Sequence, residues 1–215
     1  MLRNRDSVAK FELRVRVTDR RTRTVLLYDG AMEDLAAVNE AYFKWLDLPW
    51  TKVALDTQGR LLVADAVNGR IRLVTSEGVT TTLGGADGPR IEGFPGGIVR
   101  ARDGTVFVTT FNRAHRILTV SPDGSVATLA GSAGGGQADG RGEAARFSNP
   151  TAMAEGSDGQ LYVAEAGYCK IRRIDREGNV TTVAGGGPVY VGEPEAETID
   201  GDLAVARFTR PTSVA

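Results

Sequence analysis

One pattern occurs three times along this sequence, and this internal repeat restricts the possible folds more than any single residue does. The repeated stretches are residues 59–85, 104–131 and 159–186. Val63, Val108 and Val163 hold the same position in them, 45 and 55 residues apart. Repeats at intervals on the order of 20–50 residues are typical of solenoids, propellers and other arrays of small equivalent units. The sequence therefore predicts such an array.

Each unit contains four short segments that are rich in strand-forming residues. In the third unit they are expected at residues 151–155, 160–164, 170–174 and 180–184. The residues between strands favour tight turns, and Asp-Gly pairs occur at 103–104, 123–124 and 158–159. Four antiparallel strands joined by hairpins form one small sheet, which must stack on the next unit to bury its faces. The predicted fold class is all-β, a β-propeller of four-stranded antiparallel blades.

The repeat resembles the NHL repeat, a family of propeller blades. The family pattern runs ARF-x-x-P, then G-x-L-Y-V-A-D, N-x-R-I and D-G-x-V-x-T-x-A-G, and the chain matches it from about residue 40 to residue 215. In the third unit the match includes Ala145-Arg146-Phe147, Pro150 and Leu161-Tyr162-Val163-Ala164. The second unit has Thr110 where the family has an acid, and the third has Glu165 there but lacks the asparagine. The resemblance implies a propeller and leaves the function open, because propellers carry unrelated activities.

The two ends of the chain look complementary. Residues 206–215 repeat the opening of a unit, whereas Phe11–Val17 and Thr24–Tyr28 match the last two strands of one. A blade built from both ends closes a propeller without leaving an open sheet edge. We therefore predict a single domain over residues 1–215 with four blades: three complete ones at about 49–85, 94–131 and 150–186, and one split between 1–30 and 206–215. The alternative is a fragment of a six-bladed NHL propeller.

Composition restricts the partners and the compartment. The formal net charge is −1, so the chain has no general attraction to nucleic acid or to anionic membranes, and neither is expected as a partner. Cys169 is the single cysteine, which excludes an internal disulfide. The N-terminal residues contain no apolar segment typical of a signal peptide, and no apolar run is long enough to span a membrane. We expect a cytoplasmic protein, with secretion as the alternative if the chain is part of a longer one.

Strand direction alternates within a blade, so the loops after the second and fourth strands lie on one side, here called the long-loop face. These loops are residues 65–70, 84–94, 110–116, 131–149, 165–170 and 185–210. The other side has only tight turns. Because function concentrates in long loops on a rigid scaffold, we expect binding on the long-loop face. The candidate binding residues are Asp65, Asn68, Arg70, Arg90, Asn112, His115, Arg116, Arg146, Glu165, Tyr168, Lys170 and Arg207.

Two pairs of residues on this face could carry chemistry. His115 is the only histidine, and it would form a nucleophile–base pair with Cys169 only if their loops met. Asp65 and Glu165 end equivalent strands, where they could contact a ligand or a metal. A calcium site needs several converging oxygen ligands, and these side chains do not recur in every unit. We therefore predict no catalytic residue, no metal and no cofactor.

The alternative role of the two acids is structural, as acceptors for loop amides or as ion-pair partners of Arg70 and Lys170. On this basis the favoured function is a non-catalytic scaffold that binds a protein or peptide through the long-loop face. Six-bladed relatives of the fold include calcium-dependent lactonases and lyases, so an enzyme of that kind is the first alternative. Some NHL proteins bind RNA through a basic surface, and the many arginines near the loops make RNA binding the second.

Overall fold

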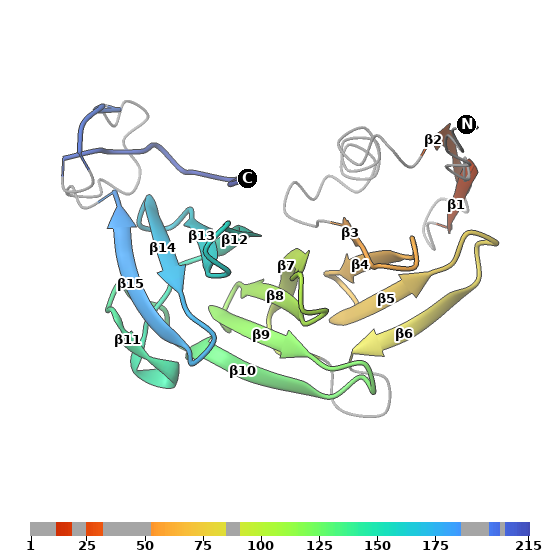
Figure 1. Ribbon diagram of the computed structural model, residues 1–215, viewed down its shortest axis with the longest axis horizontal. Coiled ribbons are helices and arrows are strands. Elements are labelled where there is room, and N and C mark those ends of the chain that lie inside the picture. Colours follow the sequence, from red (N-terminus) through yellow and green to blue (C-terminus); the bar gives the residue numbers. More distant parts are fainter. Residues whose placement is uncertain (1–11, 19–24, 32–52, 85–90, 186–197, 203–204) are drawn as a thin grey trace, which may run out of the picture.

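The computed structural model describes residues 12–18, 25–31, 53–84, 91–185, 198–202 and 205–215, and within them the chain is built almost entirely from antiparallel strands (Figure 1). Blade 1 contains β3 (Val53–Leu55), β4 (Leu61–Asp65), β5 (Arg70–Val74) and β6 (Thr80–Gly84). Blade 2 contains β7 (Phe94–Arg100), β8 (Val106–Phe111), β9 (Arg116–Val120) and β10 (Val126–Gly131). Blade 3 contains β12 (Pro150–Glu155), β13 (Leu161–Glu165), β14 (Lys170–Ile174) and β15 (Asn179–Ala184).

In each blade the strands are ordered as they follow one another in the chain, which confirms the predicted propeller class. A short strand, β11 (Gly140–Arg141), pairs with β15 at the outer edge of blade 3 and leads into a single 3-10 turn, η1 (Gly142–Ala144). The first strands β3, β7 and β12 lie next to one another from blade to blade, and the fourth strands lie on the outside of the arc (Figure 1). In the described residues, no helix is long and apolar enough to cross a membrane.

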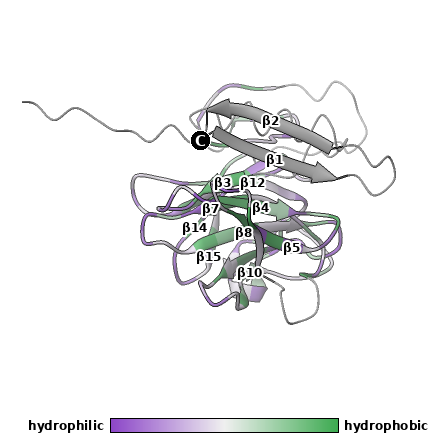
Figure 2. Cartoon of the chain, turned by 90° about the vertical axis from the view of Figure 1, so that its right-hand side faces the viewer, coloured by the Kyte–Doolittle hydropathy of each residue, from purple (hydrophilic) through white to green (hydrophobic). Residues whose placement is uncertain are grey.

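The repeated valines are core residues with one common register. Val63, Val108 and Val163 are all buried, and each lies opposite the middle of the third strand in its blade. Hydrophobic residues concentrate along the strands of the three blades, and hydrophilic ones in the connecting turns (Figure 2). Strands alternate their side chains between two faces, so every blade can bury one face against the blade before it and the other against the blade after it.

Two apolar clusters fill the spaces between blades. The first joins blades 1 and 2 through residues such as Leu62, Ile71 and Val108, and the second joins blades 2 and 3 through residues such as Phe107 and Val163. At the rim of the second cluster, the Arg176 guanidinium lies 4.9 Å from the centre of the Phe107 ring and bonds the Glu155 carboxylate at 2.6 Å. The blades therefore stabilise one another as nearest neighbours.

The expected split blade is not formed among the described residues. Strands β1 (Glu12–Thr18) and β2 (Val25–Ala31) pair with each other in a separate two-stranded sheet. Residues 211–215, which were expected to join them, carry no strand. These residues follow blade 3 instead: Phe208 packs on Gly185, the Arg210 N–H donates to the Cys169 sulfur at 3.4 Å, and the Pro211 carbonyl accepts from the Thr151 hydroxyl at 3.3 Å.

Candidate functional site

The two ends of the blades differ sharply in their polar contacts. At the tight-turn end, five of the six turns within the three blades contain an aspartate that accepts a hydrogen bond from the backbone N–H two residues later; these aspartates are Asp56, Asp103, Asp123, Asp158 and Asp175. In the sixth, the Thr75 hydroxyl accepts from the Val79 N–H at 3.3 Å. In Asp123, for example, the bond from the Ser125 N–H lowers the pKa of the carboxyl below its usual value. Such turns use their own polar groups internally, so this end offers short, self-contained loops.

At the long-loop end of blade 1, Asp65 is held by two neighbours. The Asn68 side-chain amide donates to both carboxylate oxygens, at 2.8 and 2.9 Å. The Arg72 guanidinium donates to the same carboxylate at 3.0 Å and also reaches Thr82 on the outer strand. The acid that closes the second strand is therefore an anchor for its own loop and for the third strand.

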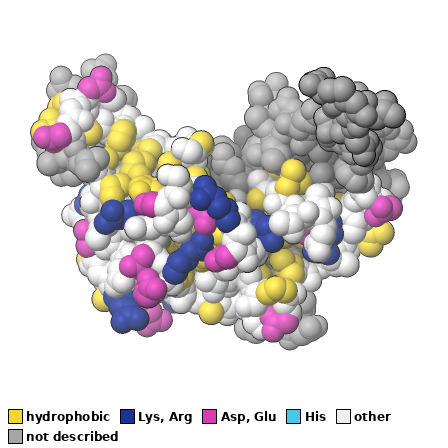
Figure 3. Space-filling model, viewed as in Figure 1, with side chains coloured by type: hydrophobic (Ala, Val, Ile, Leu, Met, Phe, Trp, Pro, Cys, Tyr) yellow, Lys and Arg dark blue, Asp and Glu magenta, His cyan; other side chains and the backbone are white. Residues whose placement is uncertain are grey.

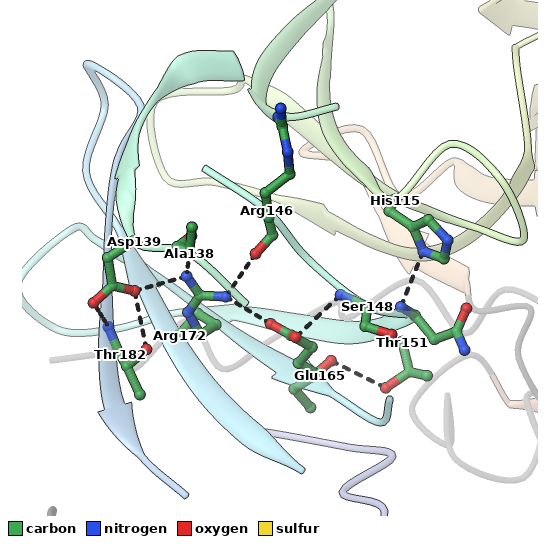
Figure 4. Close-up of polar contacts among 11 residues, drawn as sticks. His115, Ala138, Asp139, Arg146, Ser148, Thr151, Glu165, Arg172 and Thr182 are labelled. Atoms are coloured by element: carbon green, nitrogen blue, oxygen red, sulfur yellow. Dashed lines mark hydrogen bonds and ion pairs between the residues drawn. The ribbon is translucent and has the colours of Figure 1, made fainter. Parts of the chain in front are cut away.

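Blade 3 carries the same pair in a buried form (Figure 4). Glu165 and Arg172 are both fully inaccessible to solvent, and the Arg172 Nη1 donates to the Glu165 carboxylate at 2.8 Å. The Ser148 N–H donates to the other carboxylate oxygen at 3.0 Å. Burial raises the pKa of Glu165 above its usual value, while the neighbouring Arg172 charge opposes that rise. A buried charge is tolerated in a protein only when it is paired and hydrogen-bonded.

The loop before blade 3 encloses the rest of this guanidinium. The Arg172 Nη2 donates to the Ala138 carbonyl at 2.9 Å and to the Asp139 carboxylate at 2.7 Å, and Nη1 also donates to the Arg146 carbonyl at 3.0 Å (Figure 4). The Phe147 ring lies against the guanidinium, 5.1 Å from its central carbon. We call these four groups, from Ala138, Asp139, Arg146 and Phe147, the guanidinium clasp.

Blade 2 shows that the acid and the arginine belong together. At the positions of Glu165 and Arg172 it has Thr110 and Leu118. The Thr110 hydroxyl exchanges hydrogen bonds with the Arg116 backbone, accepting from its N–H at 3.1 Å and donating to its carbonyl at 3.2 Å. Acid and arginine are thus present or absent as a pair, which supports a structural role. The ion pairs run to Arg72 and Arg172, each two residues beyond the Arg70 and Lys170 that the sequence suggested.

His115 and Cys169 occupy equivalent positions, both with left-handed backbone, at φ 51° and φ 53°. Each accepts a hydrogen bond from the chain that enters the following blade: the Asn149 N–H donates to the His115 Nδ1 at 3.1 Å, and the Arg210 N–H donates to the Cys169 sulfur. Burial lowers the pKa of His115 below its ordinary 6.5, which keeps the ring neutral and able to accept. His115 therefore holds the junction between blades 2 and 3, and Cys169 holds Arg210 against blade 3.

The remaining predicted residues are dispersed around the face. Arg116 pairs with Glu92 at 2.6 Å, and Arg146 bonds the Ser132 hydroxyl and the Glu143 carbonyl. Arg207 forms a backbone bridge with Ile199. Asn112 is exposed at a left-handed position, while Arg70, Tyr168 and Lys170 are partly buried. Arg90 lies outside the described residues. Among the described residues, no group of three or more acidic, histidine or cysteine side chains is arranged to hold a metal.

One apolar feature of this face was not predicted. Phe94 opens β7 with 39% of its surface exposed, and its ring meets Phe111, at the end of β8, edge-on at 5.7 Å between centroids and 68° between planes. Both residues flank the long loops of blade 2. The sequence signal was present, since the first residue of the second-to-third loop is aromatic only in this unit.

Comparisons with known proteins support the fold. No family model matches the chain. The chain is 36% identical to virginiamycin B lyase from Nocardia farcinica over 92 residues. These residues make up 42% of this chain and 28% of that enzyme. A protein of unknown function from Bacteroides thetaiotaomicron superposes with a TM-score of 0.58 at 27% identity, covering 74% of this chain and 40% of the other.

Virginiamycin B lyase from Staphylococcus aureus superposes with a TM-score of 0.50 at 18% identity, covering 74% of this chain and 44% of the enzyme. The chain thus spans less than half the length of these relatives. The likeness to the solved lyase is a likeness of fold alone at this level of identity. Together with the blades described above, these comparisons show a virginiamycin B lyase-like β-propeller fold.

Proposed function

We propose that this chain is an NHL-type propeller scaffold that is not itself catalytic and binds a protein or peptide partner through the long-loop face. The observation that carries the proposal is the difference between its two ends. The turns at one end satisfy their own polar groups. The other end presents an exposed aromatic edge, Phe94 against Phe111, beside the Glu92–Arg116 ion pair. Aromatic side chains with an adjacent arginine are typical of the anchoring centres of protein interfaces.

The charged groups on this face support a binding role over catalysis. Asp65 and Glu165 bond arginines of their own blades, and the His115 Nδ1 accepts a backbone N–H. A nucleophile and its base must lie within hydrogen-bonding reach of each other. Each of these groups instead lies at a structural junction.

A peptide-display selection on the immobilised full chain tests the proposal. We expect enriched peptides whose affinity falls about tenfold or more with Phe94→Ala, since a truncated anchor residue costs on the order of 1–2 kcal/mol. Val126→Ala is the matched control, because Val126 has a similar exposed fraction, 37%, and follows a tight turn. Peptides that bind the Phe94 variant normally and lose affinity for the Val126 variant would place the binding surface at the wrong end. If no peptide is enriched on this chain compared with an unrelated propeller, the proposal is contradicted altogether.

A lyase activity is the second candidate, favoured by the 36% identity to the Nocardia farcinica enzyme. A histidine-to-alanine variant of the Staphylococcus aureus lyase is described as catalytically inactive. In this chain the one histidine is His115, whose Nδ1 is engaged by Asn149. Mass spectrometry of virginiamycin B incubated with the chain decides the question: conversion that disappears with His115→Ala would establish the lyase, and unchanged antibiotic would leave the scaffold.

A further inference from the structure

The junction between blades 2 and 3 is held by a side chain that changes charge near neutral pH. The Asn149 N–H, just before β12, donates to the His115 Nδ1 at 3.1 Å (Figure 4). The preceding amide, that of Ser148, donates to the Glu165 carboxylate at 3.0 Å. Two neighbouring amides of one segment are therefore held from two blades, one by a histidine of blade 2 and one by a carboxylate of blade 3.

The junction between blades 1 and 2 uses a different kind of acceptor at the equivalent position. The residue there is Gly69, and its carbonyl accepts the Ile91 N–H at 3.1 Å. A carbonyl accepts a hydrogen bond at every pH, whereas an imidazole nitrogen accepts one only while it carries no proton. Imidazole has an ordinary pKa of about 6.5 and so changes charge between about pH 5 and pH 8. The bond at Asn149 is therefore sensitive to pH, and the bond at Ile91 is not.

The His115 ring lies next to both ends of the loop that leads into blade 3. A side-chain carbon added at Gly135 would lie 3.3 Å from the ring Cδ2, so the backbone of this glycine is close to the ring. The Gly136 N–H donates to the Phe147 carbonyl at 2.9 Å, which brings the two ends of the loop together. Residues 135–149, here called the junction loop, therefore begin and end beside His115.

Protonation of the ring removes the acceptor. Because Nδ1 accepts from Asn149, the neutral ring carries its proton on Nε2. A second proton has to bind Nδ1, where it would face the Asn149 N–H, and two donors cannot bond each other. Burial lowers the pKa of His115 below its ordinary 6.5. The closed junction thus favours the neutral ring, and charging the ring favours the open junction by the same free energy.

The charged groups on the described elements around the ring are exposed or bonded elsewhere. On the loop of His115, on the junction loop and behind Ser148 they are Arg113, Arg116, Asp139, Arg141, Glu143, Arg146 and Glu165. Arg116 pairs with Glu92, and Asp139 and Glu165 pair with Arg172. Arg141 and Arg146 donate to the Glu177 carbonyl and the Ser132 hydroxyl, and Arg113 and Glu143 are exposed. Basic and acidic side chains also lie among one another on the face of the blades seen in Figure 3. Burial, and none of these charges, lowers the pKa of His115.

We propose that His115 is an acid-sensitive latch: protonation at Nδ1 releases the Asn149 amide and loosens the junction loop from blade 2. Glu165 acts in the opposite direction. Burial raises its pKa, so proton uptake by Glu165 favours the closed junction. The Ser148 amide therefore stays bonded to blade 3 while the Asn149 amide is freed. The latch does not depend on which partner the long-loop face binds.

Nuclear magnetic resonance of the full chain tests the latch, because the chain has one histidine and therefore one imidazole titration to follow. We expect the ring signal to titrate below pH 6.5 and the Asn149 amide signal to shift with the same midpoint. From about pH 7.5 to about pH 5, the protection of the Asn149 amide against hydrogen exchange, relative to an unfolded peptide at the same pH, should fall about fivefold or more as its hydrogen bond is lost. The protection of the neighbouring Ser148 amide should stay nearly constant.

His115→Asn is the matched control. Asparagine tolerates the left-handed backbone at this position, φ 51°, and its side-chain oxygen can accept the Asn149 N–H, but it does not titrate. In this variant the protection of Asn149 should not change with pH, and circular dichroism establishes that the variant is folded. A ring that stays neutral down to about pH 5, or one that titrates without a change at the Asn149 amide, would overturn the proposal. So would an equal loss of protection at Asn149 in the His115→Asn variant.

Discussion

At the residue that ends the second strand of each blade, this chain alternates between two ways of holding the third strand. Blades 1 and 3 use a carboxylate bonded to an arginine seven residues later, and blade 2 uses a threonine hydroxyl bonded to the backbone. In blade 3 the arginine is fully buried and pairs with two acids, the buried Glu165 and the partly exposed Asp139. A buried ion pair contributes little net stability compared with an apolar replacement, but losing one partner is costly.

This comparison predicts strong coupling between Glu165 and Arg172. Arg172→Leu alone leaves Glu165 buried without its partner and should lower the free energy of unfolding by about 3–5 kcal/mol. The double variant Glu165→Thr, Arg172→Leu reproduces the arrangement of blade 2 and should recover most of that loss. Urea unfolding of the four proteins in a double-mutant cycle measures the coupling. Simple addition of the two single losses would show that the pair is not a unit.

His115 predicts a pH dependence of stability. Its folded-state pKa is below the ordinary 6.5, so the unfolded chain takes up a proton first, and the free energy of unfolding falls as pH drops below about 6.5. His115→Gly, which introduces the residue of blade 1 at this left-handed position, should remove that part of the dependence. Thermal melts of both proteins between about pH 7.5 and pH 5.5 provide the comparison. Parallel curves would mean that His115 does not titrate differently on folding.

At the scale of strands and loops, the repeat was sufficient to predict the blades but not their side-chain partners. Equivalent valines and Asp-Gly turns predicted strand positions because both depend on local pattern. The partner of Glu165 was predicted wrongly, since in antiparallel strands the residue opposite in register, Lys170, is nearest along the backbone. The clasp from residues 138–147 reaches Arg172 instead, and loop geometry of that kind is not encoded in strand periodicity. The Phe94–Phe111 contact was missed although these residues lie opposite each other in β7 and β8, because the predicted first strand of blade 2 was not aligned residue by residue with the second.

The valine register allows a direct test of blade packing. Val163 is fully buried between blades 2 and 3, so Val163→Asp would bury an unpaired carboxylate and should cost more than about 4 kcal/mol. Val79→Asp is the control, because 57% of Val79 is exposed. Thermal unfolding by circular dichroism distinguishes them. A Val163 variant with a melting curve like that of the control would mean that the strand faces are assigned to the wrong sides.

For the whole molecule, each blade is stabilised by the blades next to it, because each apolar cluster joins only two adjacent blades. Blade 2 packs against blade 1 on one face and against blade 3 on the other. The second face of blade 3 lies next to Phe208. The packing of Phe208 on Gly185 repeats that of Phe147 on Gly131, but with one side left open. The difference between these two phenylalanines therefore lies in how much of each ring the described residues cover.

Phe147→Ala should cost about 3–5 kcal/mol, as expected for a fully buried aromatic residue. Phe208→Ala should cost less, because Phe208 is partly exposed and the exposed part of its ring contributes no burial to the free energy of unfolding. Urea unfolding of both variants measures the two losses. Equal losses would mean that the exposed part of the Phe208 ring does not decide its contribution to stability.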